Sequence, residues 1–146
     1  MMSTARPTLR VCDLMTSATK TLGRNDRLSS VDDLMTANRI RHVPILDEDG
    51  ALCGIVSHRD LFRGALAKAL GYGDVAQRKL LDTLVAKEVM TSDVVTTTPD
   101  TLLADAATLM LERKIGCLPV VEGTELAGIL SESDFLKLAV GRTNPA

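Results

Sequence analysis

The chain has 146 residues, of which 45% are hydrophobic and 25% are charged, and its net charge is −2. This composition is typical of a globular protein rather than a disordered one. The nearly balanced charge, with no dense run of Lys and Arg, argues against nucleic acid or an anionic membrane as the main partner.

The sequence predicts neither a membrane-spanning nor a secreted protein. No stretch approaches the roughly 18 uninterrupted apolar residues of a membrane-spanning helix, and the N-terminus lacks the apolar core of a signal peptide. Its three cysteines, Cys12, Cys53 and Cys117, are isolated from one another, which favours neither a disulfide framework nor a metal site. We therefore expect small, buried cysteine side chains and a cytoplasmic location.

Hydrophobic periodicity divides the first half into five predicted elements. Leu28, Val31 and Met35 recur at i, i+3 and i+7, which predicts one face of an amphipathic helix. In chain order we expect a strand near 19–22, this helix, strands over 42–46 and 51–57 that form a hairpin, and a closing helix over 59–69.

The segment 71–84 separates the two halves of the chain. Two glycines at its start interrupt the closing helix, and the pattern that follows predicts a further short helix. Its apolar residues Leu80, Leu81 and Leu84 can pack on the same protomer or on a second copy. We find no chemical motif here and interpret this stretch as a bridging helical segment.

The second half repeats the first. Met15-Thr16-Ser17 and Met90-Thr91-Ser92 are identical and lie 75 positions apart, and one residue is deleted in a later turn. A long period that occurs twice indicates an internal duplication. The second copy predicts a strand near 94–97, a helix that presents Leu103, Ala106 and Met110 on one face, strands over 117–121 and 125–131, and a closing helix over 133–140.

Each copy contains the same short motif, GIVSHRD beginning at residue 54 and GILSESD beginning at residue 128. In each motif a serine ends a strand and begins a helix, and an aspartate follows three residues later. Ser57 with Asp60, and Ser131 with Asp134, can therefore form capping boxes. A capping box is sufficient to explain the spacing without any ligand.

The same motif can also bind a ligand. A helix N-terminus attracts anions, and a carboxylate in the first helical turn can accept two hydrogen bonds from the diol of a ribose. The glycine of the motif would let a planar base approach the backbone. Ile55 and Ile129 could then line an apolar slot for the base.

The ordered set of motifs resembles the cystathionine β-synthase (CBS) domain family, present as a tandem pair. The resemblance covers about residues 9–141 and rests on DLM and EVM at the starts of the two repeats, followed by RHVPILDEDGALCGIVSHRDL and GCLPVVEGTELAGILSESDFL. It implies a mixed α/β (α+β) fold in which two β-α-β-β-α repeats, at 9–70 and 85–141, pack as a pseudo-twofold pair. It also implies clefts between the repeats that commonly bind adenine nucleotides or related adenosyl compounds.

The resemblance assigns roles to individual residues. It implies that the ribose is bound by Asp60 with Ser57 in repeat 1 and by Asp134 with Ser131 in repeat 2. Basic residues implied to contact phosphates are Arg41, His42, His58 and Arg59. Repeat 2 departs from this pattern, because Gly116, Cys117, Glu132 and Ser133 stand at the corresponding positions. Equal occupancy of the two sites is therefore not expected.

The function expected from these observations is a regulatory sensor. It would bind AMP, ADP, ATP or another adenosyl compound, without a metal, and signal to an unidentified effector protein. The alternative is a structural dimerisation module that binds no ligand. An enzyme is not expected, because the sequence shows no paired carboxylates in a plausible cleft, no metal-ligand spacing and no phosphate-binding glycine-rich loop. A catalytic role of His42 or His58 is not expected either, because neither has a readable nucleophilic partner. We expect a homodimer joined through Leu66, Leu70, Leu80, Leu81, Leu84, Leu136 and Leu138.

Overall fold

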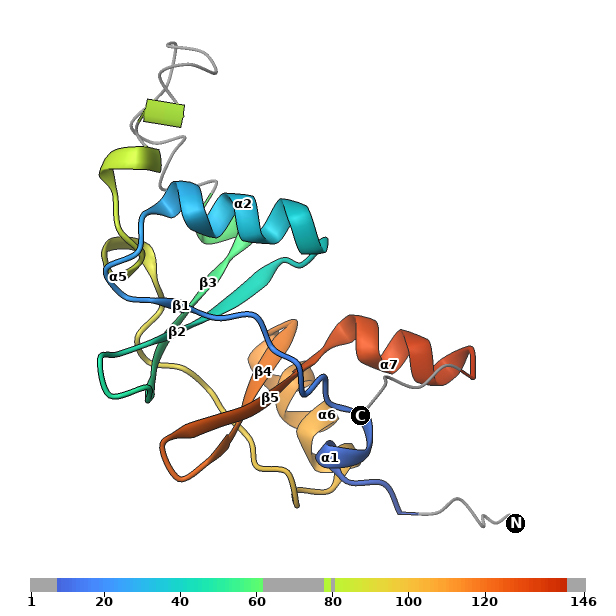
Figure 1. The fold of residues 1–146 in the computed structure, drawn as a ribbon. Coiled ribbons are helices and arrows are strands. Elements are labelled where there is room, and N and C mark those ends of the chain that lie inside the picture. The colour runs from blue at the N-terminus through green and yellow to red at the C-terminus, as the bar shows by residue number, and fades with distance from the viewer. Residues whose placement is uncertain (1–7, 62–77, 80, 142–146) are drawn as a thin grey trace. The chain divides into compact units, whose positions relative to one another are not determined.

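The computed structural model describes residues 8–61, 78–79 and 81–141, and the chain divides into two compact units (Figure 1). Lys20–Val94 forms the first, which we call the central unit. Met1–Thr19 and Val95–Ala146 together form the second, which we call the split unit. Each unit combines a small sheet with helices, as the predicted α/β fold requires.

The central unit is built on a three-stranded sheet in the order β1-β2-β3. Strand β1 (Leu22–Gly23) pairs in parallel with β2 (His42–Leu46), and β2 pairs antiparallel with β3 (Leu52–Ser57). Helix α2 (Leu28–Asn38) packs on this sheet, and the short helix α5 (Ala86–Val89) completes the unit.

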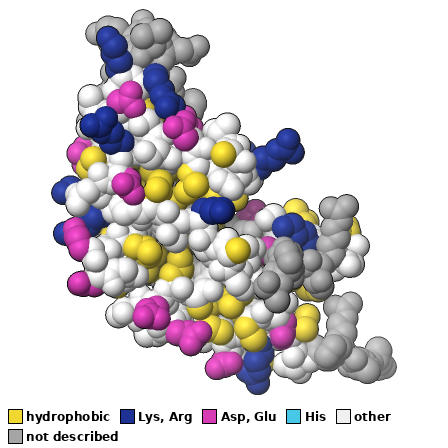
Figure 2. Space-filling view, viewed as in Figure 1, with side chains coloured by type: hydrophobic (Ala, Val, Ile, Leu, Met, Phe, Trp, Pro, Cys, Tyr) yellow, Lys and Arg dark blue, Asp and Glu magenta, His cyan; other side chains and the backbone are white. Residues whose placement is uncertain are grey.

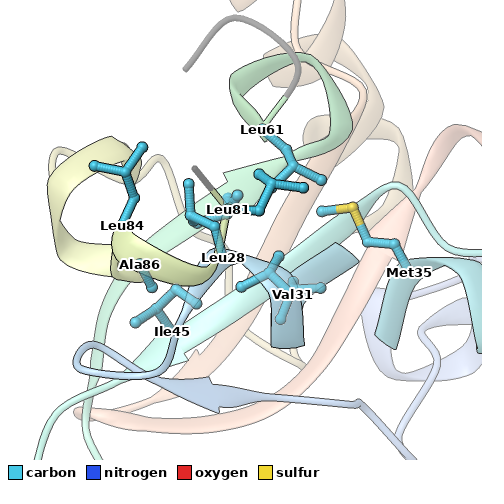
Figure 3. Packing of buried hydrophobic residues seen from close by; sticks show 10 residues of the cluster. Leu28, Val31, Met35, Ile45, Leu61, Leu81, Leu84 and Ala86 are labelled. Carbon is cyan, nitrogen blue, oxygen red and sulfur yellow. The ribbon is translucent and has the colours of Figure 1, made fainter. Parts of the chain in front are cut away.

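The predicted apolar face of α2 is confirmed. Leu28, Val31 and Met35 are at most 3% exposed, and they pack against the sheet (Figure 3). The rest of this core consists of Val43, Ile45, Val56, Leu61, Leu81, Leu84 and Ala86. Leu81 and Leu84 therefore pack on their own protomer, which removes them from the expected dimer contact.

The split unit repeats this architecture with a two-stranded sheet. Strands β4 (Cys117–Glu122) and β5 (Glu125–Ser131) form an antiparallel hairpin. Helix α6 (Leu103–Arg113) buries the predicted face in the same core as α1 (Val11–Leu14), and α7 (Glu132–Ala139) follows β5. The predicted hairpins and the helical face of the second copy are thus confirmed.

Two predicted strands differ from the structure. The strand expected near 19–22 is only two residues long and lies at Leu22–Gly23. In the described part of the chain, 94–97 contributes only an isolated parallel bridge, between Thr97 and Val120. In both copies a turn that leads into a helix follows at once, which leaves room for only one or two residue pairs.

The compact units do not coincide with the contiguous repeats of the sequence. The first segment of repeat 1, with α1 and Thr16, belongs to the split unit, which otherwise contains repeat 2. The first segment of repeat 2, with α5 and Thr91, belongs to the central unit. Each half of the sequence therefore supplies the leading segment of the other half's unit.

Several sequence predictions concern residues outside the described part of the chain. The closing helix of repeat 1 is helical at 58–61, and its predicted remainder to residue 69 lies outside. So do most of the bridging segment 71–84 and the leucines at 66, 70 and 80. Among the described residues, no helix is both long enough and apolar enough to cross a membrane.

The surface of the central unit carries both signs of charge. Arg78 Nη1 lies 3.2 Å from Asp33 Oδ1 and 3.6 Å from Asp32 Oδ2 on α2. Over this part of the surface, basic and acidic side chains lie next to one another (Figure 2). The cysteines are only partly as predicted, since Cys117 is buried but Cys53 is half-buried and Cys12 is exposed.

Candidate functional site

Both S-x-x-D motifs form capping boxes at strand-to-helix junctions. At the end of β3, the Ser57 backbone N–H donates to Asp60 Oδ2 at 3.0 Å, and the Asp60 N–H donates to Ser57 Oγ at 3.0 Å. At the end of β5, the Ser131 N–H donates to Asp134 Oδ2 at 2.9 Å, and this box is also complete. The predicted local structure is confirmed in both copies.

The two aspartates nevertheless have different surroundings. Asp134 is 1% exposed, and its carboxylate also accepts hydrogen bonds from Thr16 Oγ1 at Oδ1 and from Ser131 Oγ at Oδ2, both at 3.3 Å. Asp60 is half-buried, and among the described residues only its Oδ2 accepts a hydrogen bond. Asp60 therefore has more capacity than Asp134 to accept bonds from a diol.

The glycine of each motif packs tightly against the leading segment that the other half of the sequence supplies. A Cβ on Gly128 would lie 2.8 Å from the Thr16 carbonyl oxygen and 3.0 Å from Met15 Sδ. A Cβ on Gly54 would overlap the Met90 side chain. Approach of a planar base to this backbone, as inferred from the sequence, is therefore not the reason for the glycine.

The residues that form this close contact carry a signal that the sequence interpretation did not use. Thr16 and Ile129 exchange two backbone hydrogen bonds, at 2.9 and 3.0 Å, and Thr91 and Ile55 do the same. The repeat pattern aligns the identical Met-Thr-Ser segments at 15–17 and 90–92 but does not assign them a structural role. Their identity is the sequence signal that corresponds to this contact.

Three candidate site residues of the central unit, His42, Ile55 and Ser57, lie on one face of its sheet. His42 is paired with Ser57 and Pro44 with Ile55, and directly opposed residues share a face. Side chains alternate along a strand, so this face is opposite to the one that packs on α2. The half-buried Ile55 and its counterpart Ile129 are thus placed on the same sheet face as the capping serines.

The basic residues predicted for repeat 1 are brought together at this junction. The His58 N–H donates to the Arg41 carbonyl oxygen at 2.7 Å, which joins the start of the helix to the residue before β2. Arg41, His58 and Arg59 are exposed, and His42 is half-buried beside Ser57. The cluster therefore adjoins the Asp60 carboxylate within one unit.

The corresponding positions of repeat 2 have no basic side chain. The same backbone bond is present, from the Glu132 N–H to the Gly116 carbonyl oxygen at 3.0 Å. The pKa of the Cys117 thiol is raised to about 12, mainly by burial and also by the nearby charge of Asp134, so this group is neutral at physiological pH.

No group of three or more potential metal ligands occurs in the described ranges.

Comparisons with known proteins agree with this architecture. The family model of the CBS domain matches residues 11–67 and 86–141. A homoserine O-acetyltransferase of Methanohalophilus mahii is 32% identical over 143 residues, which are 97% of this chain and 26% of that protein. An inosine-5'-monophosphate dehydrogenase of Mycobacterium tuberculosis is 36% identical over 77% of this chain and 19% of its own length. The chain thus spans about a quarter or less of these curated relatives.

Solved structures match over nearly the whole chain. A putative acetoin utilization protein (AcuB) from Vibrio cholerae is 39% identical with a TM-score of 0.78, and 92% of each chain is covered. The CBS domain pair of protein MJ0100, in complex with 5'-methylthioadenosine and S-adenosyl-L-methionine, is 27% identical with a TM-score of 0.75 over 92% of this chain and 98% of that one. CBSX2 in complex with AMP is 26% identical with a TM-score of 0.73 over 90% and 96%. The chain therefore belongs to the CBS domain family and contains two CBS domains in tandem.

Proposed function

We propose that the protein is a regulatory module that binds an adenine nucleotide or another adenosyl compound and signals to a partner protein, without catalysing a reaction itself. Similar CBS pairs have been solved with 5'-methylthioadenosine and S-adenosyl-L-methionine and with AMP, which supports this ligand class. In the proposal, Ile55 and Ile129 contact the base, and the S-x-x-D carboxylates bind the ribose.

The observation that carries the proposal is the environment of Asp60. Its carboxylate sits in the first turn of a helix, half-buried, with Oδ1 unbonded among the described residues. Next to it are the exposed Arg41, His58 and Arg59. A carboxylate that can accept from a diol, flanked by cations that can bind phosphate, fits a nucleotide.

A second candidate is a structural dimerisation module that binds no ligand. It is favoured by the completeness of both capping boxes, which satisfy their own backbone N–H groups. Titration calorimetry with AMP, ADP, ATP, NAD and S-adenosylmethionine separates the two functions. For a sensor we expect a micromolar to millimolar Kd, roughly −4 to −8 kcal/mol. If no compound binds or raises the Tm, the structural module is the better description.

The ribose role of Asp60 can be separated from its capping role. Asp60→Ala should cost no more than about 1 kcal/mol of stability through the lost cap, but should weaken nucleotide binding by about 1.5–3 kcal/mol. Asp13→Ala is the matched control, because Asp13 also accepts from a backbone N–H at a helix start, that of Arg10 at 2.8 Å. Equal binding by the Asp60→Ala and Asp13→Ala variants would remove Asp60 from the site.

The phosphate role of the basic cluster is tested by ligands that differ in phosphate number. Arg41→Ala and Arg59→Ala should weaken ATP and ADP more than adenosine, because only phosphates gain from charge-assisted hydrogen bonds. The loss should shrink as salt rises, since both side chains are exposed. Unchanged binding of all three compounds would show that these arginines are only surface residues.

We also propose a homodimer whose contact includes α7. Near the C-terminal end of this helix, Leu136 and Val140 are 68% and 71% exposed and lie one helical turn apart. Light scattering should then give about twice the 15.7 kDa of the chain. Replacing both residues by Ser should yield a monomer, whereas Leu111→Ser, at a 79% exposed position on α6, should not. A monomeric parent protein would contradict the proposal.

A further inference from the structure

We propose that Glu132 makes the split unit selective for adenosyl compounds that carry no phosphate, whether uncharged or cationic, while the central unit accepts phosphorylated ones. The inference rests on the proposed function, since it assumes that Asp134 as well as Asp60 can bind an adenosyl ligand. It assigns different ligand chemistries to two sites that the repeated motif makes look equivalent.

The position of the Glu132 side chain is the decisive observation. Glu132 is the first residue of α7, and its N–H donates to the Gly116 carbonyl oxygen at 3.0 Å. Its side chain lies against Gly116, because a Cβ placed there would be 3.3 Å from Oε1 and 3.4 Å from Cδ of Glu132. Because Gly116 has no side chain, the Glu132 carboxylate can lie in the space next to β4.

In the central unit, the equivalent backbone hydrogen bond joins two residues with basic side chains. There the bond from His58 to Arg41 brings two exposed basic side chains to the helix start. In the split unit, Glu132 and Gly116 take their places. A ligand group that extends from the ribose past the first helical turn therefore meets cations beside Asp60 and an anion beside Asp134.

The side chains next to Glu132 at the start of α7 are polar but uncharged, apart from Asp134. Cys117 is a neutral thiol, and the hydroxyls of Ser131 and Ser133 lie 2.8 Å apart in a mutual hydrogen bond. The basic residue on α7 is Lys137, which lies nearly one helical turn beyond Asp134, toward the C-terminal end. Two carboxylates thus bound the N-terminal end of the helix, which disfavours a phosphate and favours a sulfonium or ammonium group.

The test compares three adenosyl probes in a protein whose central site is weakened by Asp60→Ala. AMP is anionic, 5'-methylthioadenosine is uncharged, and S-adenosylmethionine carries a sulfonium and an ammonium group. Calorimetry on the Asp60→Ala variant should give tighter binding of the last two than of AMP. Adding Glu132→Gln should strengthen AMP and weaken S-adenosylmethionine by about fivefold to tenfold each, the effect of one nearby surface charge. Binding of the uncharged probe should not change.

Glu125→Gln in the same background is the matched control, because Glu125 is an exposed glutamate of the β4–β5 hairpin and should leave all three affinities unchanged. The inference is overturned if the Asp60→Ala variant prefers AMP, or if Glu132→Gln shifts all three probes equally or not at all. It is also overturned if the parent protein binds adenosyl compounds but the Asp60→Ala variant binds none, an outcome that leaves the proposed function intact. Absence of binding by the parent protein would reject both.

Discussion

Gly128→Ala tests whether the leading segment, rather than a ligand, requires the motif glycine. The new Cβ would lie 2.8 Å from the backbone oxygen of Thr16, which cannot rotate away as a side chain can. Thr16 would have to withdraw, which strains or breaks its two backbone hydrogen bonds with Ile129. The variant should therefore lose stability even in the absence of any ligand.

The size of the loss follows from these contacts. Overpacking costs about 1–3 kcal/mol, and two weakened backbone hydrogen bonds add about 0.5–1.5 kcal/mol each. Replacing Gly by Ala returns about 0.4–1 kcal/mol through the unfolded chain. We expect a net loss of about 1–5 kcal/mol in the free energy of unfolding, measured by urea denaturation, and a Tm lowered by roughly 4–20 °C.

Three further variants test this explanation of the glycine. Gly54→Ala should cost less, because its closest contacts are side-chain atoms of Met90 and the backbone oxygen of Thr91 is 3.1 Å away, and Met90→Ala should partly restore stability. Met15→Ala should not rescue Gly128→Ala, since the Thr16 oxygen remains. Gly23→Ala should be nearly neutral, because the closest atom would be 3.5 Å away. A Gly128→Ala protein within about 0.5 kcal/mol of the parent, or fully rescued by Met15→Ala, would refute the explanation.

Two other predictions concern residues beside the second capping box. Thr16→Val should cost about 1 kcal/mol in urea denaturation, because it removes the hydrogen bond to Asp134, whereas Thr91→Val at the exposed equivalent position should cost little; equal losses would contradict the asymmetry. Burial raises the pKa of the Cys117 thiol from 9.0 to about 12, so the thiol loses its proton more readily in the unfolded chain. The free energy of unfolding should therefore fall as pH rises from 9 toward 12, by more in the parent than in Cys117→Ala, and a thiol reagent at neutral pH should label the exposed Cys12 first.

Local patterns were sufficient to predict the elements and the capping boxes. The faces of α2 and α6 follow from hydrophobic residues at helical spacing, and β2 from a short apolar run, because these signals lie within a few residues of one another. The S-x-x-D spacing predicted both caps for the same reason. The prediction of a strand near 94–97 was wrong. The structure forms only one backbone bridge there, at Thr97, and a single bridge does not require a run of extended residues.

The exchange of leading segments could not be predicted in this way. Met15-Thr16 and Met90-Thr91 are identical, so the sequence of either segment does not indicate which copy of the motif it contacts. The choice depends on contacts between residues more than 100 positions apart, such as Thr16 and Ile129. Periodicity within one copy contains no information about such pairs.

The two nearly identical motifs differ in chemistry although both contact an identical leading segment. Thr16 reaches the Asp134 carboxylate, while Thr91 is exposed and Asp60 keeps an oxygen without a hydrogen bond in the described structure. A diol that binds Asp134 at Oδ1 must share that oxygen with the Thr16 hydroxyl or displace it. In the proposed function, occupancy of this carboxylate would therefore be coupled to the packing of the segment that contains α1, through a bond that joins residues 118 positions apart. A diol that binds Asp60 would meet no such competitor among the described residues, so binding at the two motifs would affect the leading segments differently.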